Sequence, residues 1–552
     1  MSLLTPHLTM FHQNRSPSLL SCLDRTTGRI DINKFMLYSR FISDDVQART
    51  NAILAQSDCL STDGHNNTED PESVQSPQKK QRRRKYVMAR RNEDGLLEPI
   101  RCTESFWYIY YVENPLLEDE KFLKKFPIRF RLPYNNFEEL SAECKASNLF
   151  MRWMSCDAVG QKATPIELLV LGALRYLGRG WTFDDIEECT AVSQEVHRVF
   201  FGKFIEFSST VLYNKYVVYP KNFEEAKDHM KEFTVAGLPG ALGSTDATHI
   251  TTWQCEYNLR NNHLGGKSSS TTRSYNITVN HRRRILHSTR SWPGRWNDKT
   301  MVLFDTFVRG IRDGDHLNDV EFELFERRHG DIITIKYRGG YVIVDNGYLR
   351  WSATVPSYKV TNKLTEIRWS KWVESMRKDV ECAFGILKGR WRILKTGFRV
   401  QGVESVDKVW LTCCALHNWL LEIDGLDAGW QSQILPLTSE WEGNLGEVDC
   451  EELTQNVVLL TTAGALPPRN YDTSGMGTGD DVDPTDEIHP ADLDNEDVYD
   501  DDAISGENIR QTSELGLGYF RSRLVEHFDI LFKQNKIHWP ARRGTQPNLI
   551  QT

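Results

Sequence analysis

Residues 375–394 alternate between apolar and polar positions with the period of a helix. The apolar positions recur every three or four residues and predict one amphipathic helix with a buried stripe. The stripe consists of Val380, Ala383, Phe384, Leu387 and Trp391. A second face of the same helix carries Arg377, Glu381, Gly385 and Lys388. By itself, a carboxylate between two cations predicts only a solvated face of ion pairs.

Helical periodicity also dominates the chain before residue 236. An apolar helix is predicted over 163–178 and a second over 182–188, followed by a short connection. Ser193 is the expected N-cap of a third helix that runs to about Leu212. The polar first turn of this helix includes His197. Such a pair of helices fits either a DNA-reading helix-turn-helix or an ordinary helical bundle, and the sequence leaves both open.

Beyond residue 236 the pattern becomes that of an α/β domain. Strands are predicted over 241–250, 275–280 and 285–291, and the last two form a hairpin with a basic tip. Helical spacing follows over 297–311. A continuously apolar strand over 341–345 then precedes the amphipathic helix over 375–394. Three strands, a helix, a strand and a helix in this order predict a mixed α/β fold.

The ends of the chain lack such periodicity. Residues 1–100 are expected to be mostly disordered, with a basic cluster at 79–91. That cluster predicts a nuclear-import signal, a phosphate-binding arm or a merely solvated linker. Residues 426–510 are expected to form a disordered acidic linker, and residues 511–552 a C-terminal helix and tail.

Composition narrows the class of protein. The chain has 552 residues and a formal net charge of −9, enough length for two or three domains. Residues 472–507 hold fourteen acidic residues and no Lys or Arg; without them 67 basic residues face 62 acidic ones, a net charge of +5. A mildly basic body is compatible with nucleic-acid binding. The longest apolar run, 168–177, is too short to span a membrane, and no signal peptide is evident. Eleven cysteines without a CxxC pair argue against zinc or a disulfide framework.

Three carboxylates occupy informative positions. Asp246 and Asp345 each stand at the end of a predicted strand, and Glu381 lies on the helix that follows. Each has a simple explanation alone, since Asp345 begins an Asp-Asn-Gly turn signal. Together they are expected at the edge of the sheet where α/β folds collect ligands. Carboxylate oxygens suit Mg²⁺ or Mn²⁺, and two such ions can promote attack on a phosphodiester.

Basic residues near these carboxylates are predicted to contact a DNA backbone. Such contacts give affinity without sequence information. The predicted contact residues are Arg282, Arg283, Arg284, Arg377, Lys388, Arg390, Arg392 and Lys395.

Four segments carry a family resemblance. They are STDATHI (244–250), VDNGY (344–348), RKDVECAFGILKGRWRIL (377–394) and ALHNWL (415–420). In this order, over about residues 160–425, they resemble the transposases of the PIF/Harbinger superfamily and their domesticated nuclease relatives. The resemblance implies an RNase H-like, retroviral-integrase-like fold over 236–425, preceded by a helical, helix-turn-helix-like domain over 101–235.

The resemblance also implies a catalytic site. Asp246, Asp345 and Glu381 would be a DDE triad that holds two Mg²⁺ or Mn²⁺ ions. Asp298 aligns with a further acidic position and would either coordinate a metal or support the site. The chain departs from the family pattern at Ala247, where glycine is common.

Two histidines within the matching segments are expected to be structural. His249 lies in the first segment, one residue past Thr248, and a structural role is favoured over metal ligation. His417, with Asn418, lies on an apolar helix, where hydrogen-bonded core residues that brace the site are expected.

The leading expectation is a metal-dependent DNA endonuclease and transposase. It would hydrolyse a phosphodiester and then join the freed 3′-hydroxyl to target DNA. A domesticated, catalytically silent DNA- or chromatin-binding protein is the alternative. DNA is the expected partner, the resemblance implies a separate Myb/SANT-like DNA-binding protein, and a homo-oligomer is left open. The expected location is the nucleus, with sharing between nucleus and cytoplasm also open.

Overall fold

The computed structural model describes most of the chain from residue 88 to residue 425 and shorter segments beyond residue 425. The described ranges are 88–156, 163–265, 270–425, 430–431, 510–511 and 516–542. The predictions for residues 1–87, and most of the prediction for 426–510, fall outside these ranges. No helix within the described ranges is long and apolar enough to cross a membrane.

A short hairpin precedes the helices. β1 (Ala89–Arg91) pairs antiparallel with β2 (Leu97–Pro99). The backbone turns back where the side chain of Asn92 accepts from the N–H of Leu96 at 2.8 Å. The prediction of disorder up to residue 100 is therefore wrong for this part of the chain.

Most described residues between 106 and 216 are helical, as predicted. The helices are α2 (Phe106–Tyr108), α3 (Glu120–Phe130), α4 (Tyr134–Ala146), α5 (Ile166–Arg179), α6 (Phe183–Thr190), α7 (Gln194–Phe207) and α8 (Tyr213–Tyr216), with a π-helical turn between the last two. The predicted N-cap is confirmed, because Ser193 Oγ accepts from the N–H of Val196. His197 lies inside instead, where its Nε2 is 2.9 Å from Thr190 Oγ1. A DNA-reading role for this first turn would therefore exclude His197.

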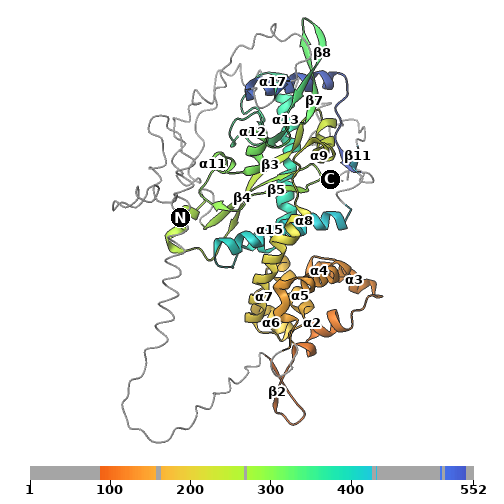
Figure 1. The fold of residues 1–552 in the computed structure, drawn as a ribbon, viewed down its shortest axis with the longest axis vertical. Helices are drawn as coiled ribbons and strands as arrows, with labels where there is room; N and C mark the ends of the chain where they lie inside the picture. The colour runs from red at the N-terminus through yellow and green to blue at the C-terminus, as the bar shows by residue number, and fades with distance from the viewer. Residues whose placement is uncertain are drawn as a thin grey trace, which may run out of the picture. The chain divides into compact units, whose positions relative to one another are not determined.

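A mixed sheet forms the centre of the region that follows these helices in the chain (Figure 1). Its main strands are β3 (Ala241–Thr251), β4 (Thr272–Val279), β5 (Ile285–Ser288), β9 (Tyr341–Val344) and β10 (Thr354–Pro356), and β6 (Trp292–Pro293) adds a short pairing to β4. The strand order is β10-β9-β3-β4-β5. β4 runs antiparallel to both of its neighbours, β3 and β5, whereas β9 runs parallel to β3 and β10 parallel to β9. The predicted mixed α/β class and the predicted strands are confirmed.

The predicted helix over 297–311 is wrong. The chain forms two helices there, α11 (Asp298–Val302) and α12 (Thr306–Asp313). Asp305 separates them because its Oδ1 accepts from the N–H groups of Phe307 and Val308 at 3.0 and 3.1 Å, which makes it the N-cap of α12.

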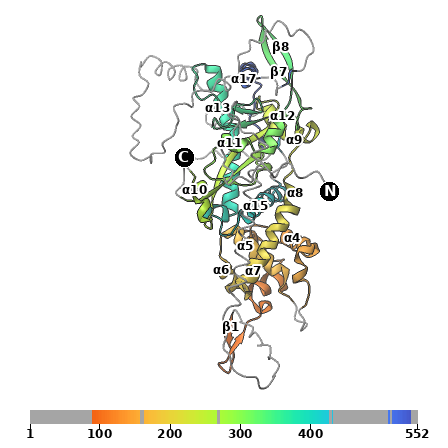
Figure 2. The same cartoon turned by 60° about the vertical axis from the view of Figure 1, so that its left-hand side comes forward.

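The amphipathic helix is longer than predicted at one end and shorter at the other. α13 extends over Leu364–Arg390, and a separate turn, α14 (Ile393–Thr396), follows the fully buried Trp391. The earlier start has a visible cause, since Trp369, Trp372, Val373 and Met376 continue the apolar stripe towards the N-terminus. α13 lies along β3 in both views (Figures 1 and 2).

Three longer helices, the short α10 (Arg260–His263), one hairpin and three very short strands are also present in the described chain. The longer helices are α9 (Phe223–Val235), α15 (Val403–Ile423) and α17 (Leu517–Lys533), the last confirming the predicted C-terminal helix. The hairpin of β7 (Glu321–Arg328) and β8 (Asp331–Arg338) was not predicted. Its two-residue turn has positive φ at both His329 and Gly330, as type I′ hairpin turns require. Three two-residue strands, β11 (Trp430–Gln431), β12 (Arg510–Gln511) and β13 (Ala541–Arg542), make short pairings.

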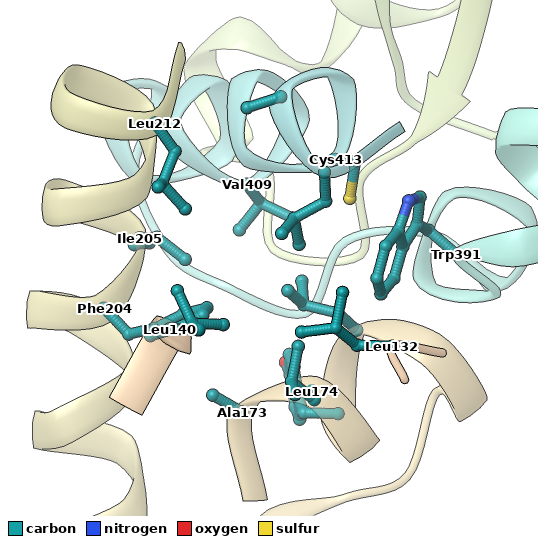
Figure 3. Packing of buried hydrophobic residues seen from close by; sticks show 14 of the residues in the cluster. Leu132, Leu140, Ala173, Leu174, Phe204, Ile205, Leu212, Trp391, Val409 and Cys413 are labelled. Atoms are coloured by element: carbon teal, nitrogen blue, oxygen red, sulfur yellow. The ribbon is translucent and has the colours of Figure 1, made fainter. Parts of the chain in front are cut away.

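Two hydrophobic clusters fix the sheet. One contains α9, α17 and the N-terminal half of α13; the other contains the helices before residue 217, α15 and the C-terminal half of α13. In the second cluster, Leu174 of α5 and Phe204 of α7 face Val409 and Cys413 of α15 and the indole of Trp391 (Figure 3). The predicted boundary at residue 235 is therefore not a packing boundary. The helical region and one face of the sheet share a core, which holds α13 against both.

Candidate functional site

Two aspartates lie side by side on neighbouring strands. β3 extends to Thr251, so Asp246 lies in the middle of the strand and not, as was predicted, at its end. β3 and β9 pair in parallel with Ser244 opposite Ile343. Continuing this register by two residues places Asp246 beside Asp345, the residue that follows β9. Neighbouring strands are about 4.8 Å apart, so both carboxylates occupy one edge of the sheet. The structure therefore brings together the two aspartates that the sequence singled out.

Asp298 reaches the same edge from the first turn of α11. A Cβ added to Gly347 would lie 2.9 Å from Asp298 Oδ2 and 3.0 Å from Asp345 Oδ1. The N–H of Gly347 donates to Asp345 Oδ1 at 2.7 Å. Glycine is thus required here for the close approach of two carboxylates, and any side chain would displace one of them.

Glu381 joins this group through Arg377. The Arg377 guanidinium donates from Nη2 to Glu381 Oε1 at 2.7 Å and from Nη1 to Asp246 Oδ2 at 3.4 Å. Its Nε donates to Glu374 at 3.0 Å. Arg377 is 13% exposed and Glu381 50% exposed, so the arginine lies between an inner aspartate and an outer glutamate. The ion pair that the helix pattern predicted is present, and it extends to the sheet.

The surroundings of Asp246 disfavour the ionisation of all the carboxyl groups at this edge of the sheet. The pKa of Asp246 is raised to about 7, chiefly by burial and also by the neighbouring Asp345 and Asp298 carboxylates. The N–H of Ala247 and the Arg377 guanidinium act in the opposite direction. A carboxyl that is costly to ionise without a nearby cation is typical of a ligand or catalytic group.

The donor atoms suit a hard divalent cation, although the triad is not assembled. Among the described residues, no group of three or more Asp, Glu, His or Cys side chains is spaced to hold one ion. Arg377 occupies the position between Asp246 and Glu381. The aspartate pair with Asp298 beside it offers the oxygen ligands that Mg²⁺ prefers. Glu381 can join such a set only if Arg377 releases Asp246 or Glu381.

A buried polar network supports the aspartates, and the sequence analysis missed it. Tyr348 Oη donates to Asn276 Oδ1 at 2.6 Å, and Asn276 Nδ2 donates to Asp305 Oδ2 at 2.6 Å. All three side chains are buried. The network ties the turn after β9 to β4 and α12, which positions Asp345. An asparagine inside an apolar strand was the available signal.

The arginines of the β4–β5 hairpin tip face other parts of the protein. Arg282 Nε donates to Glu232 Oε1 at 2.8 Å, and Arg284 Nη2 donates to Glu422 Oε1 at 2.8 Å. Arg283 between them is 39% exposed. These contacts fasten the hairpin to α9 and α15. We therefore remove Arg282 and Arg284 from the predicted DNA contacts.

Two further predicted contacts also have partners inside the protein. Lys388 Nζ donates to Thr248 Oγ1 at 2.7 Å, and burial lowers the pKa of this lysine. Arg390 Nη2 donates to Asp424 Oδ2 at 3.0 Å. Lys388 thereby ties α13 to β3 two residues beyond Asp246.

A basic patch lies where α13 and α14 meet the helical region. Arg392 and Lys395 are exposed there. Burial lowers the pKa of Arg131, and Arg179, Arg390 and Arg392 lower it further, so these four cations are close enough to repel one another. The sequence analysis missed Arg131 and Arg179, because only the shared core brings them next to α13.

The histidines have structural partners. His249 Nδ1 is 2.9 Å from Ser274 Oγ on the neighbouring strand. His417 Nε2 is 2.9 Å from the carbonyl of Arg283, and burial lowers its pKa to about 4. Asn418 Oδ1 accepts from the backbone of β5. The prediction that His417 and Asn418 are hydrogen-bonded core residues is confirmed.

The fold and the site define a mixed α/β protein with converging carboxylates at one edge of its sheet. Residues 215–427, which contain all four acidic positions, match the plant transposon protein family. The "Protein ALP1-like" of Arabidopsis thaliana is 24% identical over 332 residues, which are 59% of this chain and 77% of that protein. No solved structure gives a significant match. These similarities support a transposase-like family.

Proposed function

We propose that the protein is a metal-dependent DNA endonuclease or transposase of the PIF/Harbinger superfamily, with its active site at the acidic edge. One observation carries the proposal: the register of β3 and β9 sets Asp246 beside Asp345, while Asp298 and the Arg377–Glu381 pair approach from two helices. Oxygen ligands gathered at a sheet edge suit phosphodiester chemistry better than a structural ion-pair network does.

The strand order supports an RNase H-like domain. On one side of β3 lie β4 and β5, which together with β3 form three consecutive antiparallel strands. On the other side lie β9 and β10, which run parallel to β3. That is the arrangement expected of an RNase H-like sheet. In such a sheet the carboxylates belong on the first strand, after the fourth strand and on a following helix, which is where Asp246, Asp345 and Glu381 stand.

The residues of this chain would have distinct roles. Asp246 and Asp345 would hold two Mg²⁺ ions, which when bound supply a nucleophilic water and stabilise the leaving oxygen. Asp298 would complete the anionic surroundings of Asp345. Glu381 would add its carboxylate once Arg377 leaves Asp246, and the freed guanidinium would be available to a DNA phosphate.

The basic patch would hold the DNA backbone. Arg131, Arg179, Arg392 and Lys395 lie on or beside the C-terminal end of α13, the helix that carries Glu381. Cations there would bind phosphates and position the strand without selecting a sequence. The substrate would place the protein in the nucleus, together with the Myb/SANT-like partner that the resemblance implies.

A nicking assay tests this proposal. Purified protein with Mg²⁺ should nick supercoiled plasmid DNA, and Asp246→Asn or Glu381→Gln should each reduce the rate by at least about a hundredfold, because loss of a metal ligand costs more than loss of its support. Glu224→Gln removes an exposed carboxylate of α9 and serves as the matched control. Nicking that survives both active-site substitutions would refute the assignment.

A second function, a catalytically silent DNA- or chromatin-binding protein, is favoured by the bridging of Asp246 and Glu381 by Arg377. In that contact the positive charge of the Arg377 guanidinium compensates the two carboxylates, as a bound metal ion would otherwise do. In this case the wild-type protein would bind DNA without nicking it, and added Mg²⁺ would not raise its thermal stability.

A further inference from the structure

A cavity of about 310 Å³ opens near the far end of β3. Its wall combines the segment after β3, the start of β4 and the N-terminus of α15. Its lining includes Gln254, Glu256, His263, Arg273, Gly402 and Val403. Arg273 lies four residues along β4 from Ile277, the cross-strand partner of Asp246, which is about 13 Å of strand. The cavity is therefore separate from the acidic edge.

Arg273 is a buried cation whose hydrogen-bond acceptors among the described residues are all neutral. It is 6% exposed, and it donates to the hydroxyl and the carbonyl of Ser291 and to His263 Nε2 at 2.8, 3.0 and 3.2 Å. Burial lowers the pKa of Arg273, and the charge of Asp407 offsets only part of this. The Asp407 carboxylate itself accepts from Tyr275 and Ser291. The guanidinium charge is therefore under-compensated, and a bound anion would stabilise it.

The contact with Arg273 determines the tautomer of His263. A guanidinium can only donate, so His263 Nε2 must accept and the proton of the neutral ring must be on Nδ1. Burial lowers the pKa of this histidine to about 4, which keeps the ring neutral. The side chain is 5% exposed, and its Nδ1 has no hydrogen-bond partner within the described part of the chain. His263 is a lining residue of the cavity, and its buried Nδ1–H thus lacks an acceptor within the described part of the chain.

The N-terminus of α15 adds backbone donors. This helix has 21 residues, and its N-cap is Gly402, which has φ 84° and no side chain to satisfy the first turn. The N-terminus of a long helix carries a partial positive charge and presents N–H groups that suit anions. The acid in the first turn, Glu404, is 76% exposed and pairs with Lys408 at 2.8 Å. The uncapped turn, Arg273 and His263 therefore offer donors to one space.

Exposed aromatic side chains are next to lining residues of the cavity in the sequence. Trp253 is 63% exposed and Tyr257 88% exposed, and they bracket the lining residues Gln254 and Glu256 in sequence. Trp253 Nε1 donates to the carbonyl of Thr396 at 2.7 Å, which fixes the indole at the surface. Nucleic-acid-binding proteins commonly combine aromatic side chains, which stack on bases, with hydrogen-bond donors to the phosphates. Glu256 is an exposed lining residue of the cavity.

We infer that this cavity binds the phosphoryl group of a nucleotide, with Arg273, the Nδ1–H of His263 and the first turn of α15 as donors. Its volume is at the lower end of the range for ligand pockets, about 300–1,000 Å³, which leaves room for more than one phosphate group. The occupant is either a free mononucleotide or one unit of a DNA strand. The second source alone rests on the proposed function.

Binding to the full-length protein tests the inference. Radiolabelled phosphate and thymidine 5′-monophosphate are measured by equilibrium dialysis, with thymidine as the neutral comparison. Val403, the first residue of α15, is 43% exposed and lines the cavity. Val403→Asp places a negative charge at the site and also suits the start of a helix, so the variant should fold. Val403→Asn is the matched neutral control.

We expect saturable binding of phosphate and tighter binding of thymidine 5′-monophosphate, but none of thymidine. Val403→Asp should weaken both at least tenfold, and Val403→Asn less than about threefold. No saturable binding by wild-type protein, or equal losses in the two variants, would overturn the inference. Equal affinity for phosphate and the nucleotide would support the phosphoryl donors and reject the aromatic contribution. Asp246→Asn should leave this binding unchanged whether or not the protein nicks DNA, so the two proposals can fail separately.

Discussion

Strand β4 has an arginine near each end, and the two arginines have opposite surroundings. Arg282, beyond the C-terminal end, donates to two carboxylates, those of Asp228 and Glu232. Arg273, near the N-terminal end, is more deeply buried and donates only to neutral groups among the described residues, Ser291 included. The sequence drew attention to the first because three arginines are consecutive there. The comparison teaches that unsatisfied buried charge, rather than charge density, indicates a ligand site.

The largest expected effect is on stability, and it tests directly whether the two arginines differ in their need for a carboxylate partner. Arg282→Met leaves the Glu232 carboxylate, which is 5% exposed, without its cation, and should destabilise the protein by about 3–5 kcal/mol. Arg273→Met leaves only neutral hydrogen-bond acceptors behind and removes the longer-range attraction of the buried Asp407, so it should cost less than Arg282→Met, about 1–3 kcal/mol. Urea unfolding of the two variants at equal protein concentration measures both values. Equal losses would mean that Arg273 has a carboxylate partner in solution.

Asp246 provides the matching case of an under-compensated negative charge. Its pKa is raised from 3.8 to about 7 in the folded protein, chiefly by burial, so the folded state binds a proton more tightly than the unfolded state. The contribution of this group is therefore most favourable below about pH 4 and is lost as the pH rises to about 7. The full shift corresponds to at most about 4 kcal/mol.

Asp246→Asn should remove this decline in stability. We expect the melting temperature of metal-free wild-type protein to fall between pH 4 and pH 7 by more than that of the variant, when both are measured in chelator. Mg²⁺ should raise the wild-type value at pH 7 if the proposed site binds it, and should have little effect on Asp246→Asn. Parallel pH profiles for the two proteins would show that Asp246 is ionised at no cost.

Much of the fold followed from periodicity, and its failures have local causes. The strand that carries Asp246 and the strand before Asp345 were predictable because apolar and β-branched residues fill them. The break between α11 and α12 was missed because Phe304 and Val308 keep helical spacing across the capping residue Asp305. The β7–β8 hairpin was missed because the strands are rich in charged residues, and only the His-Gly turn indicated it.

The site was predictable only in part. The adjacency of Asp246 and Asp345 follows from the parallel pairing of two strands that the sequence displays, although Asp246 lies in the middle of its strand. The contact of Arg377 with Glu381 was predictable, because the two residues lie one turn apart on the same helix. Its contact with Asp246 was not, because Asp246 is 131 residues distant. The basic patch and the cavity at Arg273 depend on tertiary packing of α15 and the helical region, which no local pattern encodes.

The smallest expected effect concerns Ala247, where the family pattern has glycine. Ala247 lies within β3 and is not among the described residues with positive φ, so the backbone does not require glycine. Its N–H already donates to Asp246 Oδ1 at 2.8 Å. Ala247→Gly should therefore lower stability by about 0.5–1 kcal/mol, through the flexibility of glycine in a strand, and leave the nicking rate unchanged. A rate that rises in the variant would show instead that the methyl group obstructs substrate or metal, and would make the alanine itself the cause of a weakened active site.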